Sequence, residues 1–288
     1  MKRHLLPLFL LPLLLASCGR FGNKEAGTDH AERIVCIAKQ YNEIIYALHA
    51  EQDLVAVDLS STYPPAIKTL PTVGYHRALS AEGILSMKPT LIIHDNNVGP
   101  EAVMRQLTDL KIPMKVFDAK GEDLTGTQAL ISEMGAYFHR EKQADSLNHK
   151  LEADMNKAIE ARPKTLRATK VVIIHYGRAS DVYLTLTKNS FGAKLIEWAG
   201  GEVPVGGDRG MMQLSAELIG HSDPDVILLT DFGYDRLGSP EQIKTLPGVA
   251  GTKAAKNGKI YRVEEHDMVY MGPRTGEIVM KLQQLIHQ

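Results

Sequence analysis

The sequence LSAEGILSMKPTLIIH, residues 79–94, returns in altered form as LSAELIGHSDPDVILL, residues 214–229. The two segments align without a gap, 135 positions apart, and share their first four residues and a proline. In each, a serine that can cap a helix precedes a short helical pattern, which is followed by an apolar run that predicts a buried strand. A helix and strand unit repeated in the two halves of a chain indicates two lobes of similar construction.

The rest of the chain alternates in the same way between short apolar runs and helical patterns. We expect strands at residues 33–38, 54–58, 90–94, 114–117, 170–174, 226–230 and 260–263, and helices at residues 42–49, 81–87, 104–110, 193–199, 216–221 and 275–287. Short apolar strands separated by helices favour a parallel sheet covered on both faces. The predicted fold class is α/β, with one Rossmann-like lobe over residues 33–126 and a second over residues 163–288.

Residues 127–162 separate the two predicted lobes and contain no proline. Apolar residues recur there at steps of three and four, from Ala144 to Ile159, which predicts an amphipathic helix. A continuous helix of ~35 residues would be about 50 Å long, and an interruption near Gly135 is the alternative. We therefore expect one long helix to join the lobes, and a small opening of the cleft between them, because a helix lacks the loop dihedrals that absorb large hinge motions.

The first 17 residues have the features of an export signal. Residues 1–3 are basic, residues 5–15 are apolar, and residues 15–18 read LASC. The apolar run is too short to span a bilayer. LASC resembles the lipobox of bacterial lipoproteins, which implies a lipidated Cys18 that anchors the protein to a membrane and a polar tether over residues 18–32. The alternative is a secreted soluble protein in which Cys18 is incidental.

Composition and motifs argue against several other classes of protein. The net charge is −1 and no long basic run is present, so nucleic acid is not an expected partner. If Cys18 is lipidated, Cys36 is the one remaining thiol, and its apolar neighbours favour a buried small residue over a nucleophile. The GxSxG, HExxH, GxxxxGK and strand-linked GxGxxG motifs are absent, which disfavours an extracytoplasmic enzyme.

A family resemblance rests on the block VGYHRALSAEGILSMKP, residues 73–89, together with the lipobox and the repeated SxE helices. It resembles the substrate-binding proteins of bacterial ABC importers for iron complexes and cobalamin, and within them the haem-binding members. Residues 46–64, 246–260 and 271–275 extend the likeness over nearly the whole mature chain. The resemblance implies a helical-backbone periplasmic binding protein, acting as a monomer, that is no enzyme and delivers haem to a dimeric ABC permease with its ATPase.

The resemblance also implies a haem ligand, because in that family the tyrosine at the position of Tyr75 is an axial ligand to the iron. Ferric iron favours an anionic oxygen, and tyrosine is an established haem ligand. A free phenol has a pKa of about 10, so we expect Arg77 to support the phenolate or to pair with a propionate. Without the resemblance, the same two residues read as a tyrosine packed at a turn beside an exposed arginine.

A second axial ligand is expected at His175, at the end of the first strand of the C-terminal lobe, where ligands bind in open α/β sheets. A surface histidine is the alternative, and His76 is a weaker candidate. Other expected haem contacts follow strands or lie in the loop 206–212: Tyr176, Arg178, Arg209, Met211, Met212, Tyr234 and Arg236. Each of these arginines reads equally well as a solvated surface charge.

Glu82 and Glu217 occupy matching positions in the repeat. Each can compensate the dipole of its own helix, and the resemblance implies that the pair docks into arginine pockets of two permease subunits. Residues 271–274, MGPR, read as the start of a helix with a proline near its first position and carry no expected ligand role. A cobalamin or ferric-siderophore binding protein, and a haem-storage or haem-relay lipoprotein without a permease, remain as rival functions. The location is the cell envelope, on either membrane and facing the periplasm.

Overall fold

The computed structural model describes residues 32–121, 123–163, 167–178 and 180–288. The predicted export signal, Cys18 and nearly all of the tether lie outside the described residues. The described part from Glu32 onward forms one compact unit. None of its helices is both long enough and apolar enough to cross a membrane.

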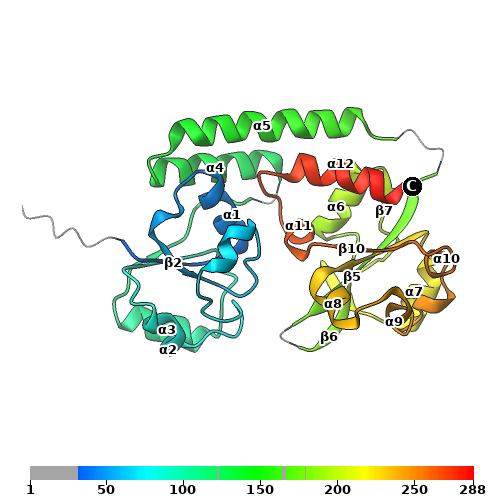
Figure 1. The fold of residues 1–288 in the computed structure, drawn as a ribbon, viewed down its shortest axis with the longest axis horizontal. Helices are drawn as coiled ribbons and strands as arrows, with labels where there is room; N and C mark the ends of the chain where they lie inside the picture. Colours follow the sequence, from blue (N-terminus) through cyan, green and yellow to red (C-terminus); the bar gives the residue numbers. More distant parts are fainter. Residues whose placement is uncertain (1–31, 122, 164–166, 179) are drawn as a thin grey trace, which may run out of the picture. The chain divides into compact units, whose positions relative to one another are not determined.

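The N-terminal lobe, on the left in Figure 1, contains a four-stranded parallel sheet in the order β2-β1-β3-β4. Its strands are β1 (Ile34–Ile37), β2 (Leu54–Val57), β3 (Leu91–His94) and β4 (Met114–Lys115), and its helices are α1 (Lys39–Ala47), α2 (Ala81–Ser86), α3 (Glu101–Asp109) and α4 (Leu124–Tyr137), with 3₁₀ turns η1 (Glu51–Asp53) and η2 (Pro65–Thr69). Alternate residues of β1 enter different cores: Ile34 and Cys36 pack with α1 and α4, whereas Val35 and Ile37 pack with α2 and α3. Both faces of this sheet are therefore buried, and Cys36 is a buried small side chain, as expected.

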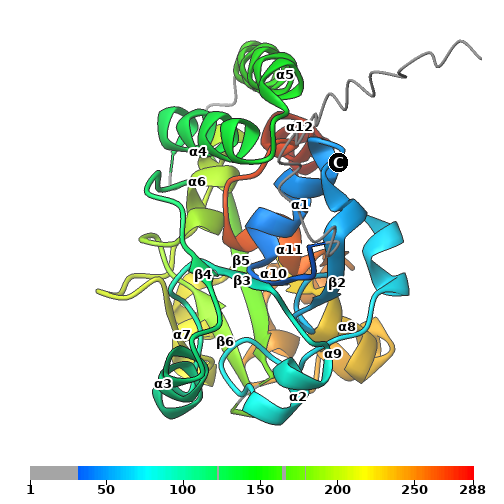
Figure 2. The ribbon, with the colours of Figure 1, turned by 90° about the vertical axis from the view of Figure 1, so that its left-hand side faces the viewer.

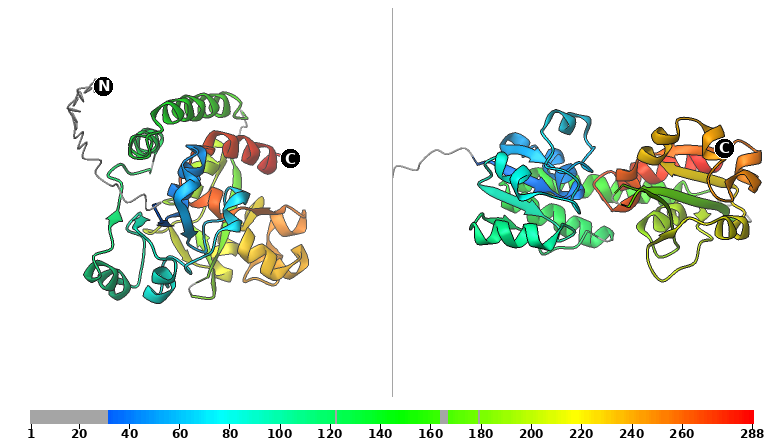
Figure 3. Two further views of the ribbon diagram at one scale, coloured as in Figure 1. Left: turned by 60° about the vertical axis from the view of Figure 1, so that its left-hand side comes forward. Right: turned by 90° about the horizontal axis from the view of Figure 1, so that it is seen from below.

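The C-terminal lobe is built on a mixed sheet in the order β10-β9-β5-β6-β8, with β7 paired to β5. Its strands are β5 (Thr169–Gly177), β6 (Val182–Leu186), β7 (Gly201–Glu202), β8 (Met211–Gln213), β9 (Val226–Thr230) and β10 (Ile260–Val263). Its helices are α6 (Phe191–Trp198), α7 (Ala216–Ser222), α8 (Asp231–Leu237), α9 (Pro240–Ile243), α10 (Lys253–Lys256), α11 (Glu265–Val269) and α12 (Thr275–Ile286), with the 3₁₀ turn η3 (Val249–Gly251). Figure 3 shows both lobes from two further directions.

One expectation for the C-terminal lobe needs correction. Its sheet is not wholly parallel, because β5 turns back into β6 and both β5–β6 and β6–β8 are antiparallel. The sequence VYLTL of β6 has the β-branched and aromatic content of a strand, so the signal was present.

The repeat behaves as its sequence predicts. Ser80 Oγ accepts a hydrogen bond from the backbone N–H of Gly83 at the start of α2, and Ser215 Oγ accepts one from Leu218 at the start of α7. The strands that follow, β3 and β9, lie parallel to β1 and β5, the first strands of their lobes. The two lobes thus share a helix and strand unit in equivalent places.

The single helix expected over residues 127–161 is wrong, and the alternative of an interruption near Gly135 is confirmed. The chain turns between α4 and α5 (Glu141–Glu160), with His139 in the left-handed region at φ 56°, and the two helices lie side by side (Figure 2). A Cβ atom on Gly135 would lie 2.4 Å from Cβ of Ala144, so this close approach needs glycine.

Helix α5 joins the two lobes. Its residues Leu151 and Met155 pack in the core of the N-terminal lobe, whereas Ala158 packs in a core of the C-terminal lobe, beside α12. At 1.5 Å per residue, its 20 residues span about 30 Å rather than the expected 50 Å.

Candidate functional site

A cavity of about 400 Å³, here called the central cavity, is lined by residues of both lobes. The N-terminal lobe contributes Lys39, Gln40, Tyr75, His76, Arg77, Asp95 and Asn97, and the C-terminal lobe contributes His175, Gly177, Ser180, Leu184, Met211, Glu265, Val269 and Tyr270. Five residues expected from the sequence meet here: Tyr75, His76, Arg77, His175 and Met211. The folding of the two halves therefore brings the GYHR block and the β5 histidine onto one cavity.

Tyr75 is half-buried and directly follows Gly74, whose φ of 102° is a conformation that favours glycine. Burial raises the pKa of the Tyr75 phenol above its ordinary value, and the charge of Glu265 adds to this effect, while nearby cations oppose it. The phenol is therefore neutral at pH 7. No described residue forms a hydrogen bond with its hydroxyl group, which leaves the oxygen available to a ligand.

Arg77 is exposed, and its Nη2 donates a hydrogen bond to Asn97 Oδ1 at 2.5 Å. It does not hydrogen-bond the Tyr75 oxygen. Its charge nevertheless lowers the pKa of Tyr75, as do the charges of Lys39 and Arg178. Arg77 thus favours the phenolate through its charge rather than through a direct bond.

His76 is buried against Tyr75, with the two ring centroids 4.3 Å apart. Its Nδ1 lies 3.1 Å from Ser60 Oγ and 3.6 Å from the fully buried carboxylate of Asp58. Burial alone would raise the pKa of Asp58, but hydrogen bonds from His76, Ser60 and Ser61 outweigh it and lower the pKa. The carboxylate is therefore charged and fixes the imidazole that supports the Tyr75 ring. Sequence reasoning missed Asp58, although DLSS directly follows β2.

His175 is 8% exposed and faces the same cavity from β5. Its Nδ1 lies 3.4 Å from Thr230 Oγ1 and 4.0 Å from Glu265 Oε2, and no described residue hydrogen-bonds its Nε2. Burial lowers the pKa of His175, although the charge of Glu265 partly offsets this. His175 is therefore neutral at pH 7, the form of imidazole that binds metal.

Glu265 and Lys39 form an ion pair between the lobes, which the sequence did not indicate. Lys39 Nζ lies 2.5 Å from Glu265 Oε1, and both side chains are largely buried. Burial would raise the pKa of Glu265, but the charge of Lys39 and the hydrogen bond that Lys39 donates lower it. The backbone N–H of Glu265 also donates to Asp231 Oδ1 at 2.9 Å, and burial raises the pKa of Asp231 to about 6. The carboxylate beside His175 is thus paired with Lys39 of the other lobe, and the backbone of the same residue is held by Asp231.

The other expected contact residues do not line the central cavity. Tyr176 donates a hydrogen bond to Asp181, which also pairs with Arg236, and Arg178 lies over the ring of Phe232. Arg209 and Met212 are exposed, and Tyr234 packs against a core of the C-terminal lobe. Met211 and Met212 are neighbours on the short strand β8, so their side chains point to opposite faces and only Met211 reaches the cavity.

Among the residues that the structure describes, no three His, Cys, Asp or Glu side chains gather into a site for a metal ion. One phenol and one neutral imidazole on a shared cavity are too few ligands for a bare ion. They are suited to a metal that already carries equatorial ligands of its own, such as the iron of a haem.

A family described as periplasmic binding protein matches residues 34–266. The chain belongs to this family. It is therefore an ABC transporter substrate-binding protein, a transport component and not an enzyme, with the two-lobe α/β fold of such proteins. Substrate-binding proteins of this kind are extracytoplasmic and work with ABC permeases.

Three similar proteins are named here, two of them after a ligand. The periplasmic heme-binding protein RhuT from Roseiflexus sp. RS-1, in its apo form, superposes with a TM-score of 0.80 at 31% identity, covering 89% of this chain and 98% of that one. The ABC transporter substrate-binding lipoprotein YvrC of Bacillus subtilis (strain 168) is 28% identical, over 89% of this chain and 80% of its own. The vitamin B12-binding protein of Pectobacterium carotovorum subsp. carotovorum (strain PC1) is 24% identical, over 75% of this chain and 74% of its own.

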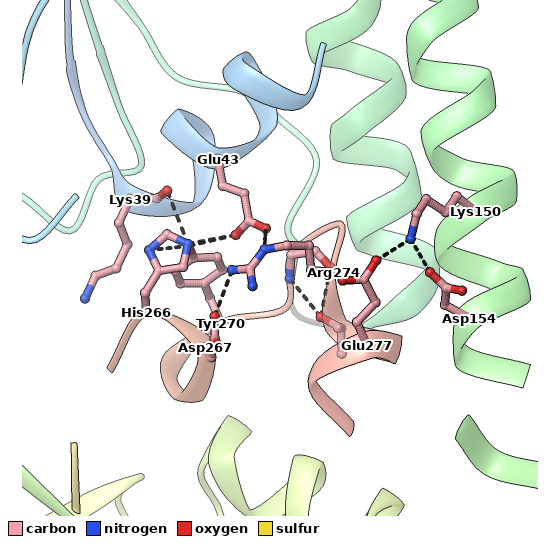
Figure 4. Close-up of polar contacts among 11 residues, drawn as sticks. Lys39, Glu43, Lys150, Asp154, His266, Asp267, Tyr270, Arg274 and Glu277 are labelled. Carbon is pink, nitrogen blue, oxygen red and sulfur yellow. Dashed lines mark hydrogen bonds and ion pairs between the residues drawn. The ribbon is translucent and has the colours of Figure 1, made fainter. Parts of the chain in front are cut away.

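A second polar group between the lobes of this periplasmic binding protein, here called the interlobe clamp, consists of Glu43, His266, Asp267, Tyr270 and Arg274 (Figure 4). Glu43 Oε2 lies 2.8 Å from His266 Nε2 and accepts a hydrogen bond from Tyr270 Oη at 3.1 Å, and Oε1 accepts one from Arg274 Nε at 2.8 Å. Burial would raise the pKa of Glu43, but His266 and Arg274 lower it. A buried, charged carboxylate of α1 is thus fully paired by residues around α11.

The segment MGPR therefore does more than begin a helix. Arg274 is the N-cap residue of α12, and Pro273 precedes the cap rather than occupying the first helical position. The guanidinium also donates to Asp267 Oδ1 at 2.8 Å and lies 3.5 Å from the centre of the Tyr63 ring. The clamp could not be predicted from the sequence, because Glu43 and His266 are 223 residues apart.

Glu82 and Glu217 are exposed, each at the second position of its helix, α2 or α7. Neither forms an ion pair with any described residue. Their place near a helix N-terminus is compatible with both readings of these acids, dipole compensation and contact with a permease.

Proposed function

We propose that this periplasmic binding protein captures ferric haem in the central cavity and delivers it to a dimeric ABC permease. One observation carries the proposal: Tyr75 and His175 lie on one cavity but come from different lobes, and neither the hydroxyl of the first nor Nε2 of the second has a hydrogen-bond partner among the described residues. A haem bound between them would have one axial ligand from each lobe. Similarity to a heme-binding protein at 31% identity supports the same assignment.

The chemistry requires that Tyr75 lose its proton when iron binds. Because the phenol is neutral at pH 7, binding of ferric iron should release one proton from it. The charges of Lys39, Arg77 and Arg178 stabilise the phenolate that remains. His175, already neutral, needs no proton transfer, and Glu265 beside its Nδ1 orients the ring.

The same proposal includes the roles that the sequence suggested outside the cavity. Cys18 carries the lipid anchor, on either membrane of the envelope, in keeping with the likeness to a lipoprotein of Bacillus subtilis. Glu82 and Glu217 contact the two permease subunits. A haem-storage or haem-relay protein would need neither acid. If the two glutamates dock onto the permease, exchange of both for glutamine should abolish permease-stimulated ATP hydrolysis.

The test is an optical titration of the protein lacking residues 1–18 with ferric haem. We expect a saturable spectrum with a phenolate charge-transfer band, lost in Tyr75→Ala and altered in His175→Ala. Tyr176→Phe is the matched control, because Tyr176 carries a phenol but does not line the cavity. Its spectrum should match that of the unaltered protein.

The rival ligand is cobalamin, which the similarity to a vitamin B12-binding protein favours. Parallel titrations with cobalamin and with a ferric siderophore separate the possibilities. Saturable binding of either one, with none of haem, would overturn the proposal.

A further inference from the structure

A second cavity of about 410 Å³, here called the side cavity, adjoins the central cavity. The two cavities share the four wall residues Gln40, Asp95, Val269 and Tyr270. Ligand pockets usually occupy ~300–1,000 Å³, so each cavity alone is at the lower end of the range. A ligand coordinated at Tyr75 therefore has the side cavity next to it, across the shared wall residues Gln40 and Tyr270.

The side cavity differs from the central one in its charge. Lys120 reaches it from the N-terminal lobe and Lys194 from α6 of the C-terminal lobe. Neither ammonium group forms an ion pair or hydrogen bond with a described residue. In the central cavity, by contrast, Lys39 already pairs with Glu265 and Arg77 already donates to Asn97.

The other described residues that line the side cavity are mostly polar or aromatic. Asn189 and Ser190, just before α6, add polar atoms, and Tyr41 and Phe191 add aromatic surface. Among the described residues that line the side cavity, Asp95 is the one carboxylate, and it also lines the central cavity. The described lining therefore carries two ammonium groups and one carboxylate.

Resting on the proposed function, we propose that the side cavity binds the carboxylate groups of the ligand, through Lys120 and Lys194. The ligand would then lie with its metal at Tyr75 and its acidic edge beyond Tyr270, bridging the lobes at both ends. The substrate class is thereby narrowed to metal macrocycles that carry free carboxylates. A corrinoid whose side chains are amides would leave both lysines without a partner.

The experiment compares ferric protoporphyrin IX with its dimethyl ester, in one detergent-containing buffer, on the protein and on Lys120→Gln/Lys194→Gln. Exposed ion pairs are weak, so we expect the double substitution to reduce affinity for the free acid roughly five- to tenfold. Affinity for the ester should change less than about twofold, because the ester has no charge to lose. High salt should weaken binding of the free acid and leave binding of the ester nearly unchanged.

Two matched variants make the result specific. Lys188→Gln removes a nearby exposed lysine that lines neither cavity, and it should bind both ligands normally. Arg77→Gln/Arg178→Gln tests the opposite orientation, with the carboxylates beside the arginines. If the arginine pair discriminates between acid and ester while the lysine pair does not, the inference is overturned but haem capture stands. If the unaltered protein binds neither porphyrin, the proposed function fails, and the inference with it.

Discussion

The interlobe clamp and the central cavity lie between the same two lobes and share Tyr270, yet they use polar residues in opposite ways. In the clamp, both oxygens of buried Glu43 have partners. In the cavity, Tyr75 Oη and His175 Nε2 have none among the described residues. Polar groups whose hydrogen bonds are all formed within the protein hold its structure together. Polar groups on a cavity that have no hydrogen-bond partner remain available to a ligand.

The clamp and the cavity should also respond differently to substitutions. Removing one partner of a buried, fully paired charge leaves the other charge uncompensated, which is costly. Removing a hydroxyl that has no partner leaves nothing unsatisfied. Substitutions in the clamp should therefore change stability, and substitutions in the cavity should change binding.

The largest expected loss of stability follows Arg274→Met, which leaves the buried carboxylate of Glu43 without its guanidinium. We expect the free energy of unfolding to fall by about 3–5 kcal/mol in denaturant titrations. The double variant Glu43→Leu/Arg274→Met should recover most of this loss, because the carboxylate of Glu43 is then removed and only the partly exposed Asp267 loses its guanidinium partner.

Arg262→Met is the control for that measurement. Arg262 also pairs with two carboxylates, on Asp235 and Glu264, but its side chain is 37% exposed. The free energy of unfolding of Arg262→Met should fall by about 1 kcal/mol or less. Equal effects at positions 262 and 274 would remove the distinction between the clamp and an ordinary surface ion pair.

A smaller effect is expected when the clamp is crowded rather than broken. A Cβ atom on Gly272 would lie 2.8 Å from Glu43 Oε2, so Gly272→Ala must displace that carboxylate. We expect a loss of about 1–3 kcal/mol in thermal or denaturant unfolding. Gly206→Ala, where an added Cβ meets no atom within 4 Å, should change stability by less than about 0.5 kcal/mol.

Asp231, beside the cavity, should give the protein an unusual pH dependence. Its folded-state pKa, about 6, is above its ordinary value of 3.8. The contribution of Asp231 to stability is therefore fully present below about pH 4 and is lost as the pH rises through about 6.

Asp231→Asn should remove this contribution while retaining an oxygen to accept the hydrogen bond from Glu265. Relative to the unaltered protein, the variant should gain up to about 2 kcal/mol of stability between pH 4 and pH 7. A stability difference that does not vary over this range would show that Asp231 is ionised in the folded protein.

The smallest effect on stability is expected for Tyr75→Phe, which removes only the unpartnered hydroxyl. Its free energy of unfolding should change by less than about 0.5 kcal/mol. Its affinity for ferric haem should nevertheless fall more than about 100-fold, since loss of a direct ligand should exceed the 10- to 100-fold effect of residues that only support ligands. A large loss of stability without loss of binding would place Tyr75 with the clamp.

The repeated helix and strand unit, the two α/β lobes, most of the parallel strands and the serine caps can all be predicted from the sequence. These follow from local patterns: apolar runs, helical periodicity and the residue before a helix. The GYHR block pointed to Tyr75 through family resemblance, and the end of a strand pointed to His175. Both now prove to lie on one cavity.

Which distant polar groups meet cannot be predicted from local sequence patterns, because it depends on the fold. Glu43 looks like a solvated residue of an amphipathic helix until His266, 223 positions away, lies against it. Lys39 and Glu265 are 226 positions apart, and neither has a local pattern that indicates the other. The antiparallel β6 and the turn between α4 and α5 were likewise settled by packing. Periodicity records which face of an element is buried, but the partner of a buried charge depends on how whole elements pack together.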